Sequence, residues 1–408
     1  GGDQCTMAAQ QEWKLVQTCT PSEELEGEEF ANYLSSVHFN ETGEFLATGD
    51  HCGRIRVYKN SKGPGGSYDL YCEFQSHDPE FDYLKSVEIE PKINAIRWRQ
   101  RLNSALFLVS TNDKTIKLWK AGCRTRPTGQ PRTRRVFKNG HEYHIHSLSL
   151  NSDQEHFISA DDLRINLWSL DVDHTVFNIV DTKPPNMAEL QEVITAAACH
   201  PLHGHVFLWA NSCGGIMLGD MRNSALCDRS AKVFKEEDDP TRHTVFTEII
   251  GSVSDAKFSQ DGRFILSRDY MTLKLWDINM EGQPLKTIQV HEPLRSRLCE
   301  LYDNDSIFDR FQCSWNGRGT SFATGSYSHL LHVYDRGSGA HVTLDPSKKV
   351  KEKSKSRFGF GRKSKPGKGE EALPEADFDK KAMQMDWHPQ SDMLAVAAGN
   401  ELRLFHLS

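Results

Sequence analysis

The feature that most constrains the fold of this chain is a pattern that returns seven times along its 408 residues. Each unit contains a short alternating segment, a turn rich in Gly, Asp and Asn, and a second apolar strand that usually ends in an aromatic residue. Because the side chains alternate in character, each strand is predicted to be half-buried, with every second side chain facing a neighbouring sheet. These final strands are predicted at 54–58, 115–119, 164–168, 216–220, 272–277, 331–335 and 401–405.

Two further strands are predicted upstream of the final strand in a unit. Residues 36–39 and 45–49 form one such pair, and 254–258 with 263–267 another; the joining turns carry Gly where a positive φ is needed. Repeats of this size that end in Trp or Trp-Asp resemble the WD-repeat family. The prediction is therefore an all-β fold, a seven-bladed WD-repeat β-propeller, in which radial repetition protects the sheet edges.

One propeller over residues 12–408 accounts for the length, with residues 1–11 predicted to be a disordered N-terminus. The strand 12–17 is predicted to complete the last blade and so close the ring. The fourth unit departs from the pattern, because Gly219 stands where an aromatic residue is expected. Long insertions between strands are where binding residues usually lie on a rigid scaffold. They are predicted at 59–92, 169–193 and 341–380, the last with a basic disordered loop at about 346–372.

Composition and charge limit the kinds of function that the chain can have. Lys plus Arg number 49 and Asp plus Glu 56, a net charge of 49 − 56 = −7, although residues 348–368 are strongly basic. An acidic body of this kind disfavours general nucleic-acid binding and favours basic peptide partners. No apolar stretch approaches the roughly 18 residues of a membrane span, and residues 1–11 lack the features of a secretory signal. Ten scattered cysteines without a CxxC pair predict reduced thiols in a cytoplasmic or nuclear protein.

Motifs for catalysis, metals and cofactors are absent from the sequence. There is no G-x-S-x-G, H-E-x-x-H or Walker loop, and the glycines of 359–364 follow no predicted parallel strand. The three imidazoles of 200–205 are interpreted as a turn between blade strands, like Trp387-His388-Pro389. The acidic loop 303–309 lacks the Gly and Glu of an EF-hand. We therefore expect no enzyme activity, no metal and no cofactor.

Two charged segments admit two interpretations each. The basic loop 348–368, which contains Ser354, Ser356 and Ser364, is either a solvated insertion or a nuclear-import or anionic-partner segment. Phosphorylation of those serines would lower its positive charge. The acidic run 23–29 is either a solvated linker or, at the propeller rim, an attractant for basic partners.

Several long strings outside the repeat pattern resemble one family, the WD-repeat B-type (55 kDa class) regulatory subunits of protein phosphatase 2A. The resemblance runs from about Trp13 to the C-terminus. It is carried by residues 73–86, 110–119, 159–168, 177–181, 225–229 and 301–305.

The resemblance implies a non-catalytic member of a heterotrimer. Such a protein docks on the HEAT-repeat scaffold subunit, which also carries the catalytic subunit. It then presents phosphoserine and phosphothreonine substrates with basic segments through the top face of the propeller. Tethering of this kind raises the local substrate concentration at the catalytic centre. Neither nucleic acid nor membrane is an implied partner.

The resemblance also implies substrate-docking residues. Asp162 would pair with a basic substrate side chain, Leu190 would add an apolar contact, and Tyr143 with His144 match an aromatic pair of the top face. For Asp161 we expect a structural role, because Asp in such turns bonds backbone amides; for Asp162 both roles stay open.

Two further groups are implied by the same resemblance. Asp303, Asp305 and Phe308 match a second, acidic and aromatic patch that serves helical partners. The insertion that lines the same platform contains Tyr83, Leu84 and Lys85.

The chain departs from the family pattern at three places. His51 stands where the family has Lys and would lose most of its positive charge near neutral pH. Phe30 stands where the family has an acidic residue. Between Lys120 and His141 the family carries a long hairpin arm along the scaffold, whereas this chain has only the residues 121–140.

Either the scaffold is held more weakly, or this is an altered or incomplete form. A free WD-repeat adaptor for basic peptides, which does not assemble on the scaffold, is therefore the alternative function.

Overall fold

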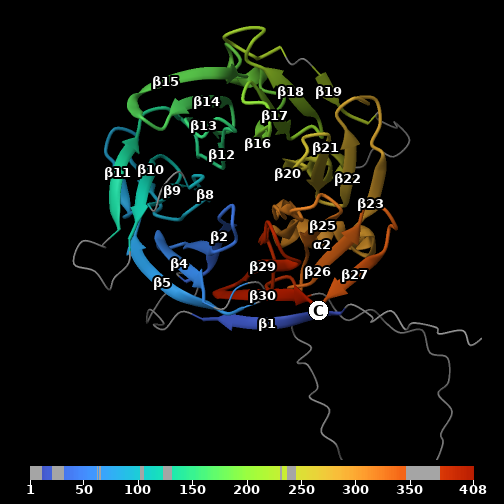
Figure 1. The fold of residues 1–408 in the computed structure, drawn as a ribbon. Coiled ribbons are helices and arrows are strands. Elements are labelled where there is room, and N and C mark those ends of the chain that lie inside the picture. The colour runs from blue at the N-terminus through green and yellow to red at the C-terminus, as the bar shows by residue number, and fades with distance from the viewer. Residues whose placement is uncertain are drawn as a thin grey trace, which may run out of the picture.

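Seven antiparallel sheets are arranged in a ring around a central axis (Figure 1). The structure is a computed structural model. It describes residues 12–20, 32–61, 63, 66–101, 105–122, 131–229, 232–236, 245–345 and 377–408. The expected N-terminal segment 1–11, the acidic run 23–29, Phe30 and the whole basic loop lie outside these residues.

Each sheet contains four strands and forms one blade, and the innermost strand lies nearest the axis (Figure 1). Blade one consists of β2 (Leu34–Phe39), β3 (Phe45–Asp50), β4 (Arg54–Asn60) and β5 (Tyr68–Gln75). Blade two consists of β8 (Ala95–Trp98), β9 (Leu106–Thr111), β10 (Ile116–Ala121) and β11 (Arg132–Phe137). Blade three consists of β12 (Ser147–Leu150), β13 (His156–Ala160), β14 (Arg164–Ser169) and β15 (Val172–Asp181). Blade four consists of β16 (Ile194–Cys199), β17 (Val206–Asn211), β18 (Ile216–Asp220) and β19 (Lys232–Phe234).

The remaining three blades complete the ring. Blade five consists of β20 (Val253–Phe258), β21 (Phe264–Asp269), β22 (Thr272–Asp277) and β23 (Lys286–Gln289). Blade six consists of β24 (Cys313–Trp315), β25 (Ser321–Gly325), β26 (Leu331–Asp335) and β27 (His341–Leu344). Blade seven consists of β28 (Gln384–Trp387), β29 (Met393–Ala398), β30 (Glu401–Leu407) and β1 (Trp13–Cys19).

The seven-bladed propeller predicted from the repeats is confirmed, with one correction to its insertions. The strands predicted to end each unit are the third strands of the blades, and a fourth strand lies outside each of them. In blades one, three and six this outer strand, β5, β15 or β27, lies within a segment predicted to be an insertion. These strands escape detection because they carry exposed and polar residues on the blade edge, which weakens the alternation.

The ring closes through β1, as predicted. This strand pairs antiparallel with β30, from Trp13 opposite Leu407 to Cys19 opposite Leu402. The Trp13 ring also packs edge-on against Trp387 of β28, with 5.6 Å between ring centroids. Residues almost 400 positions apart in sequence therefore share one sheet, and the first strand of the chain holds the last blade.

The apolar core lies between the blades. One cluster joins Ile55 and Val57 of blade one to Leu108 of blade two, and corresponding clusters join the other neighbouring pairs. Gly219 is explained by this packing, since a Cβ there would lie 2.7 Å from the Phe207 ring and 3.0 Å from Trp209. In blade four the aromatic residues come from β17, so they take up the space that an aromatic residue at position 219 would fill.

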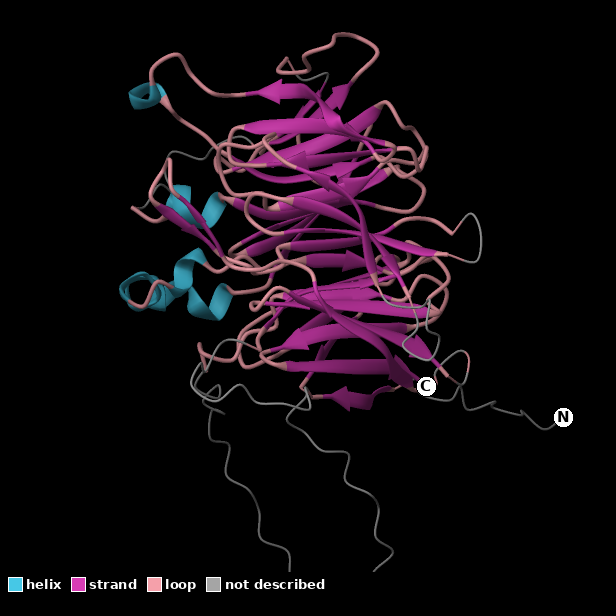
Figure 2. Cartoon of the chain, turned by 90° about the vertical axis from the view of Figure 1, so that its left-hand side faces the viewer, coloured by secondary structure: helices cyan, strands magenta, loops and turns pink. Residues whose placement is uncertain are grey.

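The short helices are gathered on one face of the ring (Figure 2). They are η1 (Met187–Glu189), α1 (Thr247–Gly251), η3 (Glu292–Arg297), α2 (Leu298–Asp303) and η4 (Ser306–Phe308). A two-stranded hairpin, β6 (Glu80–Asp82) with β7 (Val87–Ile89), projects from the same face. We call this side the helical face. Among the described residues, no helix is long and apolar enough to cross a membrane.

The histidines of 200–205 lie in a turn between β16 and β17, as predicted. His200 Nδ1 accepts hydrogen bonds from the amides of Leu202 and His203, both at 3.1 Å. His388 makes the same contacts with Gln390 and Ser391, at 3.0 and 2.9 Å, in the corresponding turn of blade seven. Within the part of the chain that the structure describes, no group of three or more His, Cys, Asp or Glu side chains could hold a metal ion.

Candidate functional site

The turns between the second and third strands of the blades have a common design on the helical face. The first residue of the turn is often Asp or Asn, whose side chain accepts backbone amides two to four residues ahead. Asn112, Asp161, Asn211 and Asp269 all do so. Such Asx turns hold the loop rigid, and the following residue is then presented at a fixed place around the axis.

Asp161 is a structural residue, as expected. Its side chain is fully buried and accepts hydrogen bonds from the amides of Leu163 at 2.9 Å and Arg164 at 2.7 Å. The second oxygen lies 2.9 Å from His141 Nδ1. Burial acts to raise the pKa of Asp161, but the hydrogen bonds from His141 and the two amides outweigh it and lower the pKa to about 2. His141 in turn bonds Ser159 Oγ at 2.6 Å, so this carboxylate anchors the whole turn.

Asp162, the next residue, has a different environment. It is half-buried, and its carboxylate makes no hydrogen bond or ion pair with any described residue. Burial, and then the neighbouring Asp161, raise the pKa of Asp162, while Arg310, His144 and Lys114 act in the opposite direction. A carboxylate surrounded by cations but bonded to none of them can accept a hydrogen-bonding cation from outside.

Tyr143 and His144 lie beside Asp162, in the segment that connects β11 to β12. The Tyr143 amide lies 3.5 Å from Asp161 Oδ2, which ties this segment to the turn. His144 is 68% exposed, with its Nδ1 3.6 Å from Asp113 Oδ2 in the corresponding turn of blade two. The aromatic pair expected at the top face is therefore adjacent to the open carboxylate.

Leu190 follows η1, in the connection from blade three to blade four. The Asn186 side chain caps this short helix by accepting the Ala188 amide at 3.1 Å, and the Leu190 amide donates to Met187 O at 3.3 Å. The Leu190 and Met187 side chains are partly exposed. The next residue, Gln191, lines the groove described below.

Tyr83, Leu84 and Lys85 form the tip of the β6–β7 hairpin. The Asp82 carboxylate accepts the amides of Leu84 and Lys85 at 3.0 and 3.2 Å, which shapes the turn. Tyr83 is 86% exposed and Leu84 98% exposed. Lys85 lies close enough to Lys114 to lower the pKa of that amine, after the larger effect of burial. The hairpin tip thus reaches toward the cations beside Asp162.

Asp303, Asp305 and Phe308 lie together at the end of α2 and in η4. Both carboxylates are exposed, and Asp305 has a left-handed backbone with φ of 57° that starts the tight turn into η4. Phe308 is 53% exposed and its ring lies 5.9 Å from that of Tyr302. The acidic and aromatic residues expected to form a patch are brought together by this turn.

Two members of that aromatic surface are not predicted from the sequence. Tyr302 lies between Phe308 and Phe246, with 5.9 Å between the centroids of Tyr302 and Phe246. Phe246 precedes α1 in blade five and is more than 50 positions from Tyr302. Tyr302 lies within residues 301–305, which carry the family resemblance. It is on the exposed side of α2. No sequence pattern predicts a role for Phe246, because only the fold brings it close to Tyr302.

His51 occupies the turn position of blade one that Asp162 occupies in blade three. Its environment, first through burial and then through Lys92, lowers the pKa of His51 to about 4. The side chain is therefore neutral at pH 7, and this position lacks the positive charge that the family pattern has there.

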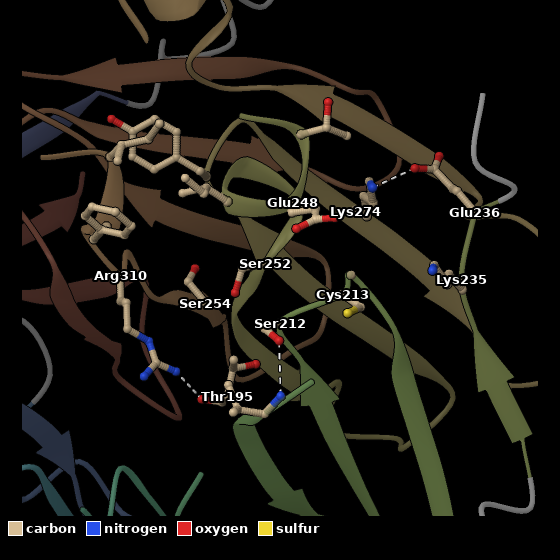
Figure 3. A pocket seen from close by; sticks show the side chains of 18 of the residues that line it. Thr195, Ser212, Cys213, Lys235, Glu236, Glu248, Ser252, Ser254, Lys274 and Arg310 are labelled. Atoms are coloured by element: carbon tan, nitrogen blue, oxygen red, sulfur yellow. Dashed lines mark hydrogen bonds and ion pairs between the residues drawn. The ribbon is translucent and has the colours of Figure 1, made fainter. Parts of the chain in front are cut away.

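A long groove of about 1430 Å³ crosses blades four and five (Figure 3), and of the residues predicted for the site Phe308 lines it. Arg310 and Thr195 lie at its inner end, and the ion pair Lys274–Glu236, 2.6 Å long, lies at its outer end. A second cavity of about 680 Å³ follows the axis of the ring and is lined by the innermost strands. Phe308, Asp309, Arg310 and Thr195 line both cavities, so they mark the place where groove and axial channel meet.

Comparison with known proteins places these features in a family context. The family model for "WD domain, G-beta repeat" matches residues 19–59, 132–169 and 243–277. The chain is 48% identical over 418 aligned residues to the B beta isoform of the 55 kDa regulatory subunit of serine/threonine-protein phosphatase 2A from Carassius auratus. That alignment covers 92% of this chain and 94% of the relative.

Among solved structures, the fold is similar to that of Chaetomium thermophilum Raptor, with a TM-score of 0.66 and 16% identity. The match covers 98% of this chain but only 30% of the Raptor chain. This likeness therefore concerns the propeller fold alone.

Proposed function

The chain belongs to the family of B-type 55 kDa regulatory subunits of serine/threonine-protein phosphatase 2A, and we propose that it binds the scaffold–catalytic core of that phosphatase. Its helical face then presents phosphoserine and phosphothreonine substrates to the catalytic subunit. The chain contributes no catalytic step of its own. Its contribution is proximity, since a tethered substrate has a high effective concentration at the catalytic centre.

The open carboxylate of Asp162 is the observation that carries the docking part of this proposal. The carboxylate of its neighbour Asp161 is buried and bonded, whereas that of Asp162 is accessible and makes no bond to a described residue. A basic side chain of a substrate would supply the missing charge-assisted hydrogen bond. Tyr143 and His144 lie in the segment tied to the same turn, and together with Leu190 they would contact the neighbouring residues of the substrate.

The first experiment mixes the purified chain with scaffold and catalytic subunits and follows assembly by size-exclusion chromatography with light scattering. A stable 1:1:1 peak is the expected result. The purified chain by itself should release no phosphate from a phosphopeptide. Phosphate release by the chain alone would contradict the non-catalytic assignment.

The alternative function is a free adaptor for basic peptides, and one observation favours it. The connection between β10 and β11, where the family pattern has a long arm, spans only 122–131, and β10 pairs with β11 up to Lys120 opposite Arg132. Residues 123–130 lie outside the described part of the chain. A folded chain that binds basic peptides but does not co-elute with the scaffold at micromolar concentration would support the adaptor.

Charge reversal at Asp162 separates docking from assembly. Asp162→Lys should abolish the capture of basic peptides under either function, and should leave the trimeric peak unchanged if the chain is a regulatory subunit. We also propose a location in the cytoplasm or nucleus, which fluorescence microscopy of the tagged chain tests; fluorescence confined to the secretory pathway would contradict it.

A further inference from the structure

We propose that Arg310 is a specificity-determining residue that binds a carboxylate of the docked substrate segment, next to the basic side chain held by Asp162. The inference rests on the proposed docking function and deepens it. It assigns the substrate class: segments in which a basic residue is accompanied by Asp or Glu, rather than segments that are only basic.

The position of Arg310 supports this role. The guanidinium donates from Nη2 to Thr195 O, in β16. The amide of Ile194, the preceding residue, donates to the Asp162 carbonyl at 2.7 Å. Arg310 and Asp162 are thus bonded to two consecutive residues of the same strand, although Arg310 belongs to the connection between blades five and six.

The remaining N–H groups of Arg310 are available. A guanidinium has five N–H donors, and only one bond, to Thr195 O, is made with the described residues. Protein surrounds the side chain on several sides, yet it stays accessible to solvent because it lies where groove and axial channel meet. A planar fork with free donors at the end of an open groove matches the geometry of a carboxylate.

The backbone on both sides of Arg310 is held in place. Asp309 accepts a hydrogen bond from the Tyr327 hydroxyl at 2.9 Å and pairs with Lys381 Nζ at 2.7 Å. Phe311 is buried, with its ring 5.1 Å from that of Tyr327. A guanidinium that starts from a fixed backbone loses less conformational entropy when it binds.

The charges of Asp162 and Arg310 distinguish a purely basic ligand from one that has both a basic and an acidic side chain. Asp162 and Arg310 are electrostatic neighbours but form no ion pair with each other. A ligand with only a basic side chain would meet the attraction of Asp162 and the repulsion of Arg310 and Lys114. A ligand that brings both charges would satisfy both groups, and specificity of this kind follows from combined attraction and repulsion.

A carboxylate is favoured over a phosphate as the group at Arg310. The phosphoryl group of a substrate must remain accessible to the catalytic subunit for its hydrolysis. A phosphate bound by Arg310, where the groove meets the axial channel, would be withdrawn from it. The ligand we assign is therefore the side chain of Asp or Glu.

The test selects peptides on the full chain. A pool of short synthetic peptides shares one fixed central arginine and is randomised on both sides; bound peptides are recovered and sequenced. The unmodified chain should enrich Asp or Glu at one flanking position. Arg310→Gln should lose that enrichment but still retain peptides of the pool through their fixed arginine, and Arg310→Glu should enrich Lys or Arg at the same position.

Affinity measurements then quantify the effect. For the most enriched peptide, replacement of its acidic residue by Gln should weaken binding to the unmodified chain about tenfold, about what a charge-assisted hydrogen bond contributes. The same replacement should change binding to Arg310→Gln less than about twofold. Arg310→Lys, which keeps the charge but not the fork, should give an intermediate effect.

The outcomes separate the inference from the proposed function. If the unmodified chain retains the arginine peptides but enriches no acidic residue, or if Arg310→Gln keeps the acidic preference, the inference is wrong and the docking function stands. If Asp162→Asn binds arginine peptides as well as the unmodified chain does, the docking function itself is wrong. Circular dichroism of each variant verifies that the propeller is folded.

Discussion

Two adjacent aspartates on the helical face have the same charge and opposite roles. Asp161 is enclosed by amides and His141, which stabilise the ionised form, and Asp162 has no such partners among the described residues. Removing a buried acceptor leaves donors unsatisfied, which costs far more than removing an open one. The pair therefore offers a matched comparison in which the fold and the docking site are tested one residue apart.

Asp161→Asn is expected to destabilise the protein by about 2–4 kcal/mol, because two amides and His141 lose a charged acceptor. Asp162→Asn should unfold at the same or a slightly higher temperature, but bind arginine-containing peptides about tenfold more weakly. Thermal denaturation and fluorescence anisotropy measure the two effects. Equal loss of stability in both variants would contradict the division of roles.

The two carboxylates should also respond to pH with opposite sign. The pKa of Asp161 is about 2 in the folded protein against 3.8 for the ordinary group, so its charge stabilises the fold above about pH 4 and the effect is lost as the pH falls toward 2. At neutral pH this amounts to about 2 kcal/mol. The pKa of Asp162 is raised, so ionisation of Asp162 opposes folding, and this opposition disappears at acid pH.

Urea titrations between pH 2 and 7 test this prediction, with roughly 1.4 kcal/mol expected per unit of pKa difference. The stability advantage of the unmodified chain over Asp161→Asn should shrink as the pH is lowered. Asp162→Asn should be at least as stable as the unmodified chain at neutral pH, and equal to it once the carboxyl of Asp162 is protonated. If the unmodified chain stays more stable than Asp161→Asn by a constant free energy of unfolding down to pH 2, the hydrogen bonds of Asp161 do not lower its pKa as described.

At the scale of elements, η4 is held by side chains from blades five and six. The Tyr327 hydroxyl, which has one proton to donate, lies 2.9 Å from its acceptor Asp309 Oδ2, 2.7 Å from Ser306 O and 2.8 Å from the Tyr270 hydroxyl. A short 3-10 helix has little stability of its own. Its place, and with it the place of Phe308 and Arg310, therefore depends on this buried hydroxyl.

Tyr327→Phe should destabilise the protein by about 1–3 kcal/mol, because an acceptor beside η4 loses its hydroxyl donor. The substitution should also weaken the binding of partners that contact Phe308 or Arg310. Tyr334→Phe is the control, since Tyr334 is also a buried residue but its hydroxyl has no hydrogen bond to a described residue. Denaturation and peptide binding should therefore separate the two variants; identical behaviour would mean that the hydroxyl of Tyr327 does not position η4.

The sequence predicts the inner three strands of a blade better than its outer strand. Inner strands face sheets on both sides and keep their apolar pattern, whereas β5, β15 and β27 lie on the blade edge and carry exposed polar residues. The site follows the same logic. Asp161 and Asp162 lie in a turn that the sequence predicts. Phe246 and Arg310 are brought to the site only when the ring is folded, so no local sequence pattern predicts their place there.

Gly219 shows how packing overrides a repeat pattern. Gly219→Ala should destabilise blade four by about 1–3 kcal/mol, because the added Cβ would meet the rigid rings of Phe207 and Trp209. Gly282→Ala is a suitable control, since a Cβ there has no atom within 4 Å. Urea denaturation measures both, and an unchanged midpoint for Gly219→Ala would show that the rings move aside.

At the scale of the whole molecule, stability comes from blade-to-blade contact around a ring. The apolar clusters lie between neighbouring sheets, so each blade is supported from both sides only while the ring is closed. Closure depends on β1, which supplies the outer strand of blade seven and packs Trp13 against Trp387. An open ring would expose the edge of β30 and weaken the boundary between blades seven and one.

Deletion of residues 1–20, which removes β1, should therefore destabilise the entire propeller by roughly 3–5 kcal/mol, since about five backbone hydrogen bonds and one buried aromatic contact are lost. Deletion of residues 1–11 keeps β1 and is the matched control, with no change expected. Hydrogen exchange should show faster exchange of the β30 amides that face β1 only in the longer deletion. Unchanged exchange at β30, or equal stability of the two deletions, would mean that the ring is held closed without its first strand. In that case the remaining strands of blade seven would have to support the helical face on their own, and docking at Asp162 would survive the loss of β1.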